Sequence, residues 1–306
     1  MGFFYPYILY IEAKNLKILV IRAGALGDTL MLMPAISKIE NDSEIIIAGR
    51  RPGIDYLRPY VAGCMDIETA GWHMLFREGT QDIPDLSLPR FDHVVGFLND
   101  PDGRLMIRLK AFFPESRVSM FPVFPGEGDK THMALYMAKA FSSAGLPIDA
   151  NRAFEDSLKA PLMCATKTTP GKRNHIIIHP GSGSRKKNYP PAFWLELIKE
   201  LKRSGFAEKQ RITLLLGPAE EEILPFFRDN LKKGDAFFEV MPEREALLTL
   251  LSNASVYLGH DSGITHLAAM IGIHVIAVFK ESFIEQWRPL GPNVQLITAV
   301  PGNSPL

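Results

Sequence analysis

The sequence contains little cysteine, no excess of charge of either sign and no apolar run long enough to cross a bilayer. Its two cysteines, Cys64 and Cys164, are far apart in the chain. This spacing excludes a disulfide scaffold and a cysteine-ligated metal centre, and it favours a reducing cytoplasm. The 34 basic residues balance the 34 acidic ones, so nucleic acid is not an expected partner.

Residues 1–11 are aromatic and apolar, but the stretch contains Pro6 and has neither a basic start nor a cleavage site. A signal peptide is therefore not expected, and the stretch is too short to span a membrane. It fits an extra strand, an extension without fixed structure or a patch that touches a membrane surface. We favour core packing or an unstructured tail.

The length of 306 residues suits two domains of about 150 residues each. Apolar runs alternate with segments of helical periodicity, and this alternation predicts parallel sheets with helices on both faces. The predicted strands are residues 17–22, 44–48, 91–97, 117–121, 176–178, 212–216, 255–258, 273–279 and 294–298, and the predicted helices include 106–113, 132–144, 191–203 and 243–251. Residues 157–173 lose the periodicity, so we expect a linker there, between domains at 1–156 and 174–306.

A glycine turn with a carboxylate follows the first strand. The turn contains Gly24 and Gly27 but not the first glycine of the dinucleotide-binding fingerprint G-x-G-x-x-G. Asp28 would also repel a phosphate placed in the same turn. A helical apolar pattern then runs from Leu30 to Ile39. Asp28 is a candidate general base, because a carboxylate fixed beside a glycine turn can take a proton from a substrate. A helix cap is the other interpretation of Asp28, and the two are compatible.

The loop at residues 180–187 combines glycines, hydroxyl groups and positive charge. Ser182, Gly183 and Ser184 supply N–H and hydroxyl donors, and Lys187 closes a run of three basic residues. Such a loop at the carboxyl end of a parallel strand suits a diphosphate, although its spacing is not that of a P-loop. A solvated basic loop is the alternative.

A second candidate anion site lies in residues 259–272. Asp261, Ser262 and Gly263 form a turn that leads into a helix, and His266 lies on the first turn of that helix. The free N–H groups at a helix start favour an anion. The alternative is an ordinary helix capped by Asp261 or Ser262, with His266 at the surface.

One further acid completes the candidate set. Glu220 follows a predicted strand and is a candidate acceptor for ribose hydroxyl groups; the alternative is a surface acid in the run of glutamates at 220–222. No pair of histidines at helical spacing meets a carboxylate, so no metal site is expected. A Ser–His–Asp nucleophile elbow is absent too.

Three blocks of the sequence, taken in order, resemble glycosyltransferase family 9, the family of the ADP-heptose:lipopolysaccharide heptosyltransferases. They are KILVIRAGALGDTLMLMPA at residues 17–35, IIHPGSGSRKKNYP at 177–190, and LGHDSGITHLAA at 258–269 with Trp287 and Pro289 behind it. The blocks extend over nearly the whole chain, and their joint order is more specific than any one of them. Two positions depart from the family pattern, namely Tyr189 in place of Trp and Lys280 in place of a small residue.

The resemblance implies the GT-B fold, in which two doubly wound Rossmann-like α/β domains face each other across a cleft with the donor on the second domain. The residues matched to the family's site are Asp28 as catalytic base, Lys187 at the donor phosphates and, for the nucleotide sugar, Asp261, Ser262, Gly263 and His266. The implied reaction is an inverting, metal-independent transfer of a sugar, heptose from ADP-heptose, onto a lipopolysaccharide core or related glycan. No cofactor besides the donor is expected.

The implied partners are a nucleotide-sugar donor and a lipid-linked or glycan acceptor, which suit a cytoplasmic protein with a peripheral contact at the inner membrane. Transferases of this type end in a helix that crosses back to the first domain. Few residues follow position 298, so we expect weaker docking of the two domains. The alternative functions are an inactive nucleotide-sugar-binding protein of the same fold, which the retained site residues disfavour, and an NAD(P) oxidoreductase, which the missing glycine fingerprint disfavours.

Overall fold

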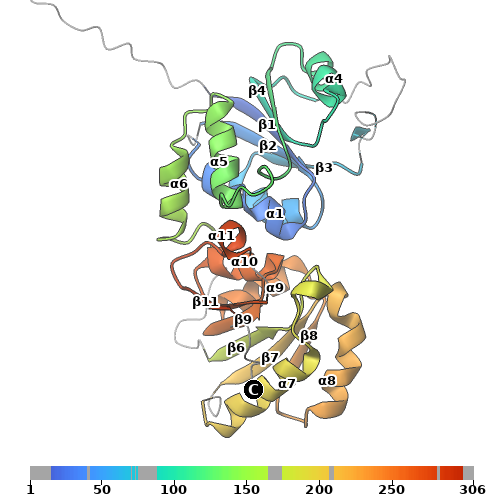
Figure 1. Ribbon diagram of the computed structural model, residues 1–306, viewed down its shortest axis with the longest axis vertical. Coiled ribbons are helices and arrows are strands. Elements are labelled where there is room, and N and C mark those ends of the chain that lie inside the picture. The colour runs from blue at the N-terminus through green and yellow to red at the C-terminus, as the bar shows by residue number, and fades with distance from the viewer. Residues whose placement is uncertain are drawn as a thin grey trace, which may run out of the picture.

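The computed structural model consists of two α/β domains, one above the other in Figure 1. It describes residues 15–39, 42–69, 71–72, 74, 88–164, 174–206, 210–280 and 283–298. Each domain is built on its own parallel sheet, so the fold class predicted from the alternating strands and helices is confirmed. Among the helices that these residues form, none is both long and apolar enough to cross a membrane.

The N-terminal sheet has five parallel strands in the order β3-β2-β1-β4-β5. They are β1 (Lys17–Arg22), β2 (Glu44–Gly49), β3 (Gly63–Asp66), β4 (His93–Phe97) and β5 (Arg117–Phe121). Ile18 of β1 lies opposite Ile45 of β2 on one side and His93 of β4 on the other. The chain order reverses between β1 and β4, and in open sheets of this kind ligands bind at that reversal, beyond the carboxyl ends of the strands.

Helices cover both faces of the N-terminal sheet. They are α1 (Leu26–Leu30), α2 (Met33–Ile36), α3 (Gly53–Leu57), the 3-10 helix η1 (Arg58–Tyr60), α4 (Arg104–Phe112), α5 (Met133–Ser143) and α6 (Ala150–Ser157). Successive side chains of a strand point to opposite faces. Leu19 of β1 therefore joins the buried cluster that contains Leu109 of α4, and Val20 joins the cluster that contains Leu30 of α1.

The C-terminal sheet has six parallel strands in the order β11-β10-β9-β6-β7-β8, with the reversal between β6 and β9. The strands are β6 (His175–His179), β7 (Arg211–Leu216), β8 (Phe237–Val240), β9 (Val256–His260), β10 (His274–Phe279) and β11 (Val294–Thr298). The helices are η3 (Arg185–Lys187), α7 (Pro191–Arg203), η4 (Pro218–Ile223), α8 (Leu224–Asn230), α9 (Arg244–Ser252), α10 (Gly263–Ile271) and α11 (Ile284–Trp287). α7 and α8 pack on one face, and α9 and α10 on the other.

The structure departs from the sequence-based expectation in a few elements. The helical pattern from Leu30 to Ile39 contains two short helices, α1 and α2, because Pro34 at the second position of α2 has no N–H with which to continue the hydrogen bonds of α1. The elements β3, α3, α6 and β8 are not indicated by the apolar pattern. Both β3 and β8 are four-residue edge strands with no fully buried residue. Residues 1–14, with the apolar N-terminal stretch, and 165–173 of the predicted linker lie outside the described residues.

The two domains share one hydrophobic core. α1 and α10 pack against each other across the domain boundary (Figure 1), and one buried cluster contains both Leu30 of α1 and Leu267 of α10. The backbones approach so closely that a Cβ atom on Gly263 would lie 2.8 Å from the Cβ atom of Leu26. The expected weakness of domain docking is therefore not found.

A buried histidine also joins the domains. His132 caps α5 through Nδ1, which accepts the N–H of Ala134 at 3.1 Å, and its Nε2 therefore carries the proton and donates to the carbonyl of Arg288 at 2.9 Å. The side chain is buried. Burial lowers the pKa of His132 from 6.5 to about 4; the Arg288 carbonyl opposes this shift, and the charges of His266 and Arg288 add to it.

The free energy of unfolding should fall as the pH is lowered from about 6.5 to about 4. In this window the unfolded chain binds a proton at His132 and the folded chain does not, so protons favour unfolding, by about 3 kcal/mol for this group at the acid end. Denaturant melts of the wild type and of His132→Asn, which keeps a helix cap without a titrating ring, check this. The variant should be less stable at pH 7 but show a shallower loss on acidification than the wild type. Equal slopes for His132→Asn and the wild type would contradict the assignment.

Candidate functional site

A cavity of about 470 Å³ lies between the two domains, at the carboxyl ends of both sheets. Its walls are the turn after β1 and the loops after β6, β7 and β9; of these strands, β1, β6 and β9 flank the reversals in strand order. The structure brings all the residues singled out from the sequence into this cavity, namely Asp28, Ser182, Gly183, Ser184, Lys187, Glu220, Asp261, Ser262, Gly263 and His266. They come from segments that are up to about 240 residues apart in the sequence, and only the packing of the two domains places them together.

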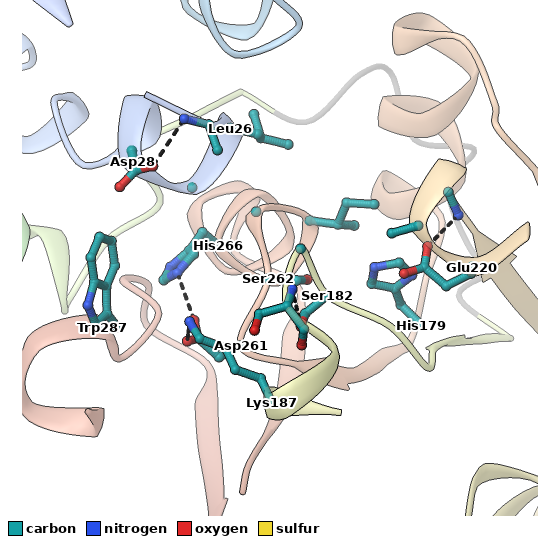
Figure 2. A pocket seen from close by; sticks show the side chains of 18 of the residues that line it. Leu26, Asp28, His179, Ser182, Lys187, Glu220, Asp261, Ser262, His266 and Trp287 are labelled. Atoms are coloured by element: carbon teal, nitrogen blue, oxygen red, sulfur yellow. Dashed lines mark hydrogen bonds and ion pairs between the residues drawn. The ribbon is translucent and has the colours of Figure 1, made fainter. Parts of the chain in front are cut away.

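Asp28 is the carboxylate that the N-terminal domain contributes. It lies on the first turn of α1, across the cavity from His266, Asp261 and Lys187 (Figure 2). Its Oδ2 accepts the N–H of Ala25 at 3.0 Å, and its Oδ1 accepts a hydrogen bond from Arg22 at 3.2 Å. Helix capping and access to the cavity are thus both present in the geometry, because the side chain remains 22% exposed.

Arg22 is a buried partner of Asp28 that the sequence reasoning did not single out. It ends β1, is 1% exposed, and donates from Nη1 to the carbonyl of Val123 at 3.0 Å and from Nη2 to Asp28. Burial lowers the pKa of Arg22, while the charge and hydrogen bond of Asp28 oppose that shift. The available signal was an arginine at the end of an otherwise apolar strand. The hydrogen bond from Arg22 fixes the position of the Asp28 carboxylate.

Lys187 and Asp261 form an ion pair on the opposite wall. The Nζ atom of Lys187 lies 2.5 Å from Oδ2 of Asp261, and the two side chains are 42% and 9% exposed. Burial would raise the pKa of Asp261, but the hydrogen bonds and charges of His266 and Lys187 outweigh it and lower this pKa. Asp261 therefore stays ionised and holds the ammonium group of Lys187 at the cavity.

The start of α10 fits an anion site. Ser262 caps the helix by accepting the N–H of Thr265 at 3.3 Å, which leaves N–H groups of the first turn, including that of Gly263, at the cavity wall. His266 faces Asp261 with Nε2 at 3.5 Å from Oδ1, and its Nδ1 is buried without a hydrogen-bond partner in the described part of the chain. With 2% exposure His266 is not a surface residue, so that interpretation is wrong. His266 therefore lines the cavity as a buried partner of Asp261.

The loop after β6 is held rather than solvated. The Oγ of Ser182 donates to Asn188 at 2.6 Å and accepts the N–H of Ser184 at 3.3 Å, and both serines line the cavity. Nε2 of His260 accepts the N–H of Tyr189 at 3.0 Å, and burial lowers the pKa of His260 to about 4, which keeps that acceptor neutral. These contacts fix the backbone on both sides of Lys187.

Glu220 and His179 form the far end of the cavity (Figure 2). Glu220 is 2% exposed, so its interpretation as a surface acid is wrong. One carboxylate oxygen accepts the N–H of Gly217 at 2.7 Å; the other is buried with no partner among the described residues and lies against Gly181, where a Cβ atom would be 1.7 Å away. His179 donates from Nδ1 to the carbonyl of Leu215 at 3.0 Å, and its pKa is lowered by burial, which outweighs the charge of Glu220. With the proton on Nδ1, the Nε2 of His179 is an acceptor, and both residues line the cavity, an arrangement that suits hydroxyl donors.

Two aromatic side chains close the cavity on the Asp28 side. Trp287 of α11 and Phe124, in the loop after β5, are in edge contact with ring centroids 6.4 Å apart. His179 and Phe124 were not singled out from the sequence. His179 ends its strand directly before a Pro-Gly pair, which was a usable signal, whereas Phe124 lies in a Pro-rich and Gly-rich loop with no pattern. Among the residues that the structure describes, no group of three or more His, Cys, Asp or Glu side chains could hold a metal ion.

The sequence matches the model of one protein family, and the structure is similar to solved structures that share one fold. A family model for glycosyltransferase family 9 (heptosyltransferase) matches residues 127–305, which include the second and third sequence blocks. The chain is similar to the family 9 glycosyl transferase of Veillonella parvula (TM-score 0.67, 13% identity, 95% of this chain and 89% of that chain). It is also similar to E. coli ADP-heptose lps heptosyltransferase II (0.66, 19%, 94% and 92%) and to E. coli heptosyltransferase WaaC with ADP (0.64, 16%, 93% and 94%). No curated protein matches the sequence. The shared fold is the two-domain GT-B architecture.

Proposed function

The chain belongs to glycosyltransferase family 9, and we propose that it transfers a sugar with inversion from a nucleotide diphosphate, specifically heptose from ADP-heptose, to a lipopolysaccharide core or related glycan. One observation carries this proposal. A carboxylate from the first domain, Asp28, and a cationic, amide-rich wall from the second, with Lys187 and the start of α10, face one cavity. Inverting transfer needs a base on one side of the anomeric carbon and charge stabilisation on the other.

The chemistry follows from this division of the cavity. Asp28 takes the proton of the acceptor hydroxyl while the hydroxyl oxygen bonds to the anomeric carbon. The bond from that carbon to the diphosphate breaks on the opposite face, and the electron pair leaves with the diphosphate. Lys187 and the N–H groups at Ser262 and Gly263 stabilise the charge that grows there. Attack opposite to the leaving group inverts the anomeric configuration.

The donor assignment has two supports. Glu220 and His179 line the far end of the cavity, where the Glu220 carboxylate and the Nε2 of His179 would accept hydrogen bonds from ribose hydroxyl groups. The structurally similar E. coli WaaC is described with ADP, and a second E. coli neighbour is an ADP-heptose transferase. The loop residues Ser182, Gly183 and Ser184 then lie along the same nucleotide. ADP-heptose is therefore the first donor to test.

The proposal extends to the setting of the reaction. We assign the acceptor side to residues 1–156 and the donor side to 174–306, with 157–173 as the linker. A lipid-linked acceptor would bring the enzyme to the cytoplasmic face of the inner membrane as a peripheral protein.

Turnover of a donor panel tests the proposed function. ADP-, UDP- and GDP-sugars, with ADP-heptose among them, are incubated with the protein and a heptose-free lipopolysaccharide core. EDTA is present throughout, because Lys187 rather than a metal ion takes the leaving charge in this proposal. We expect release of ADP, an inverted anomeric configuration in the product by NMR, and thermal stabilisation by ADP. Nucleotide binding without release of a diphosphate from any donor would support an inactive binding protein instead.

A further inference from the structure

Phe124 is an exposed aromatic residue in a loop that is otherwise tightly held. Its side chain is 50% exposed and lines the cavity. Three side chains fix the two residues before it: Tyr136 donates to the carbonyl of Pro122 at 2.9 Å, Asn99 accepts the N–H of Val123 at 3.3 Å, and Arg22 donates to the carbonyl of Val123 at 3.0 Å. Exposure of a large apolar ring is unfavourable. The loop is therefore built to present this ring to the cavity.

Phe124 is tied to Asp28 through a single guanidinium group. The Cζ atom of Arg22 lies 5.6 Å from the centroid of the Phe124 ring, and the same guanidinium donates to Asp28 at 3.2 Å. Arg22 is buried and makes these contacts from the end of the central strand β1. The position of the ring relative to the Asp28 carboxylate is thus set by a rigid element and not by a free loop.

Phe124 also contacts the second domain, through Trp287. Trp287 meets the edge of its ring at a centroid distance of 6.4 Å and an angle of 67°, and Trp287 in turn lies 6.5 Å from His266. Trp287 thus lies within ring-contact distance of both Phe124 and His266. On the side of the first domain, Phe124 contacts Arg22, the side chain that holds Asp28.

We propose that Phe124 is a stacking platform for the acceptor, and that the ring which packs on it is the sugar whose hydroxyl reaches Asp28. This inference rests on the proposed glycosyl transfer. One face of a pyranose ring is lined with C–H groups and packs well on an aromatic ring, and binding sites of this kind combine apolar walls with a few polar groups. Stacking on Phe124 fixes the plane of the acceptor, while Asp28 selects the hydroxyl that reacts.

The test separates acceptor binding from donor chemistry. Phe124→Ala should raise the KM for heptose-free lipopolysaccharide about 10-fold or more, since the contact buries much of an aromatic ring. The KM for ADP-heptose should change far less than the KM for the acceptor, because the groups assigned to the donor belong to the second domain. Phe124→Leu should resemble Phe124→Ala because it lacks a flat face, and Phe124→Tyr should retain the wild-type KM. Phe237→Ala is the matched control, because that ring is 48% exposed and carries Arg211 at 3.9 Å but lies outside the cavity.

The experiment distinguishes failure of the proposed function from failure of the stacking platform. If the wild type releases no nucleotide diphosphate from any donor, the proposed function fails and the stacking site fails with it. If the wild type is active and Phe124→Ala keeps the acceptor KM, the function stands and the stacking platform is refuted. An equal rise of the acceptor KM in Phe124→Ala and Phe124→Tyr would also refute it, because the residue would then act through Asp28 or the fold.

Discussion

Asp28→Asn is expected to fold and to bind the donor nucleotide, but to lose sugar transfer by a factor on the order of 10² to 10⁴. The amide cannot take the proton of the acceptor hydroxyl, whereas the groups assigned to the diphosphate belong to the other domain and are untouched. Initial rates of ADP release with saturating acceptor, together with the Kd for ADP from calorimetry, measure the two effects separately.

A control for Asp28→Asn must be an aspartate that caps a helix as Asp28 does. Asp149 caps α6 by accepting the N–H of Arg152 at 3.0 Å and does not line the cavity. Asp149→Asn should lose about 1 kcal/mol or less of stability and none of the transfer rate. Asp28→Asn is expected to lose stability as well, because the amide can offer only one acceptor oxygen to Ala25 and Arg22. Transfer by Asp28→Asn at the wild-type rate would remove Asp28 from the role of base.

Lys187→Met is expected to lower the rate of transfer by about 10²- to 10³-fold, which is the typical effect of removing one preorganised donor from a site of developing charge. The negative charge of the leaving diphosphate grows in the transition state, and Lys187 is the cation that Asp261 holds at the cavity. The rate loss should appear in single-turnover measurements with saturating ADP-heptose, where donor binding no longer limits.

Lys186 provides a control with the same change of net charge. It lies in the same 3-10 helix as Lys187, but it is exposed and does not line the cavity. Lys186→Met should retain the wild-type single-turnover rate. If the two variants behave alike, the effect of Lys187 is one of overall charge, and the assignment to the leaving group is wrong.

The strands of both sheets could be predicted because each buried strand is a short apolar run between turn residues. β1 and β7, for example, match the predicted ranges within one residue. The break between α1 and α2 was not predicted, because the apolar pattern from Leu30 to Ile39 was given more weight than Pro34, which cannot continue the hydrogen bonds of a helix. The edge strands β3 and β8 could not be predicted in the same way, because no residue in them is fully buried.

The residues of the site likewise differ in whether a local sequence pattern indicates them. The glycine turn at Asp28, the loop of Lys187 and the start of α10 each have a local pattern, which explains why the sequence indicates them. Arg22 and Phe124 have none, because their roles depend on burial and on contacts between segments about a hundred residues apart. Glu220 was ambiguous for a related reason. A run of three glutamates suggests a surface, and only the packing against Gly181 shows that the first of them is buried.

A crystal structure of the protein with a non-transferable ADP-heptose analogue tests the central claim most directly. The account predicts the diphosphate against Lys187 and the N–H groups of Ser262 and Gly263, with the anomeric carbon turned toward Asp28 and the face opposite the diphosphate open to it. A diphosphate bound elsewhere, or an anomeric carbon that faces away from Asp28, would contradict the account.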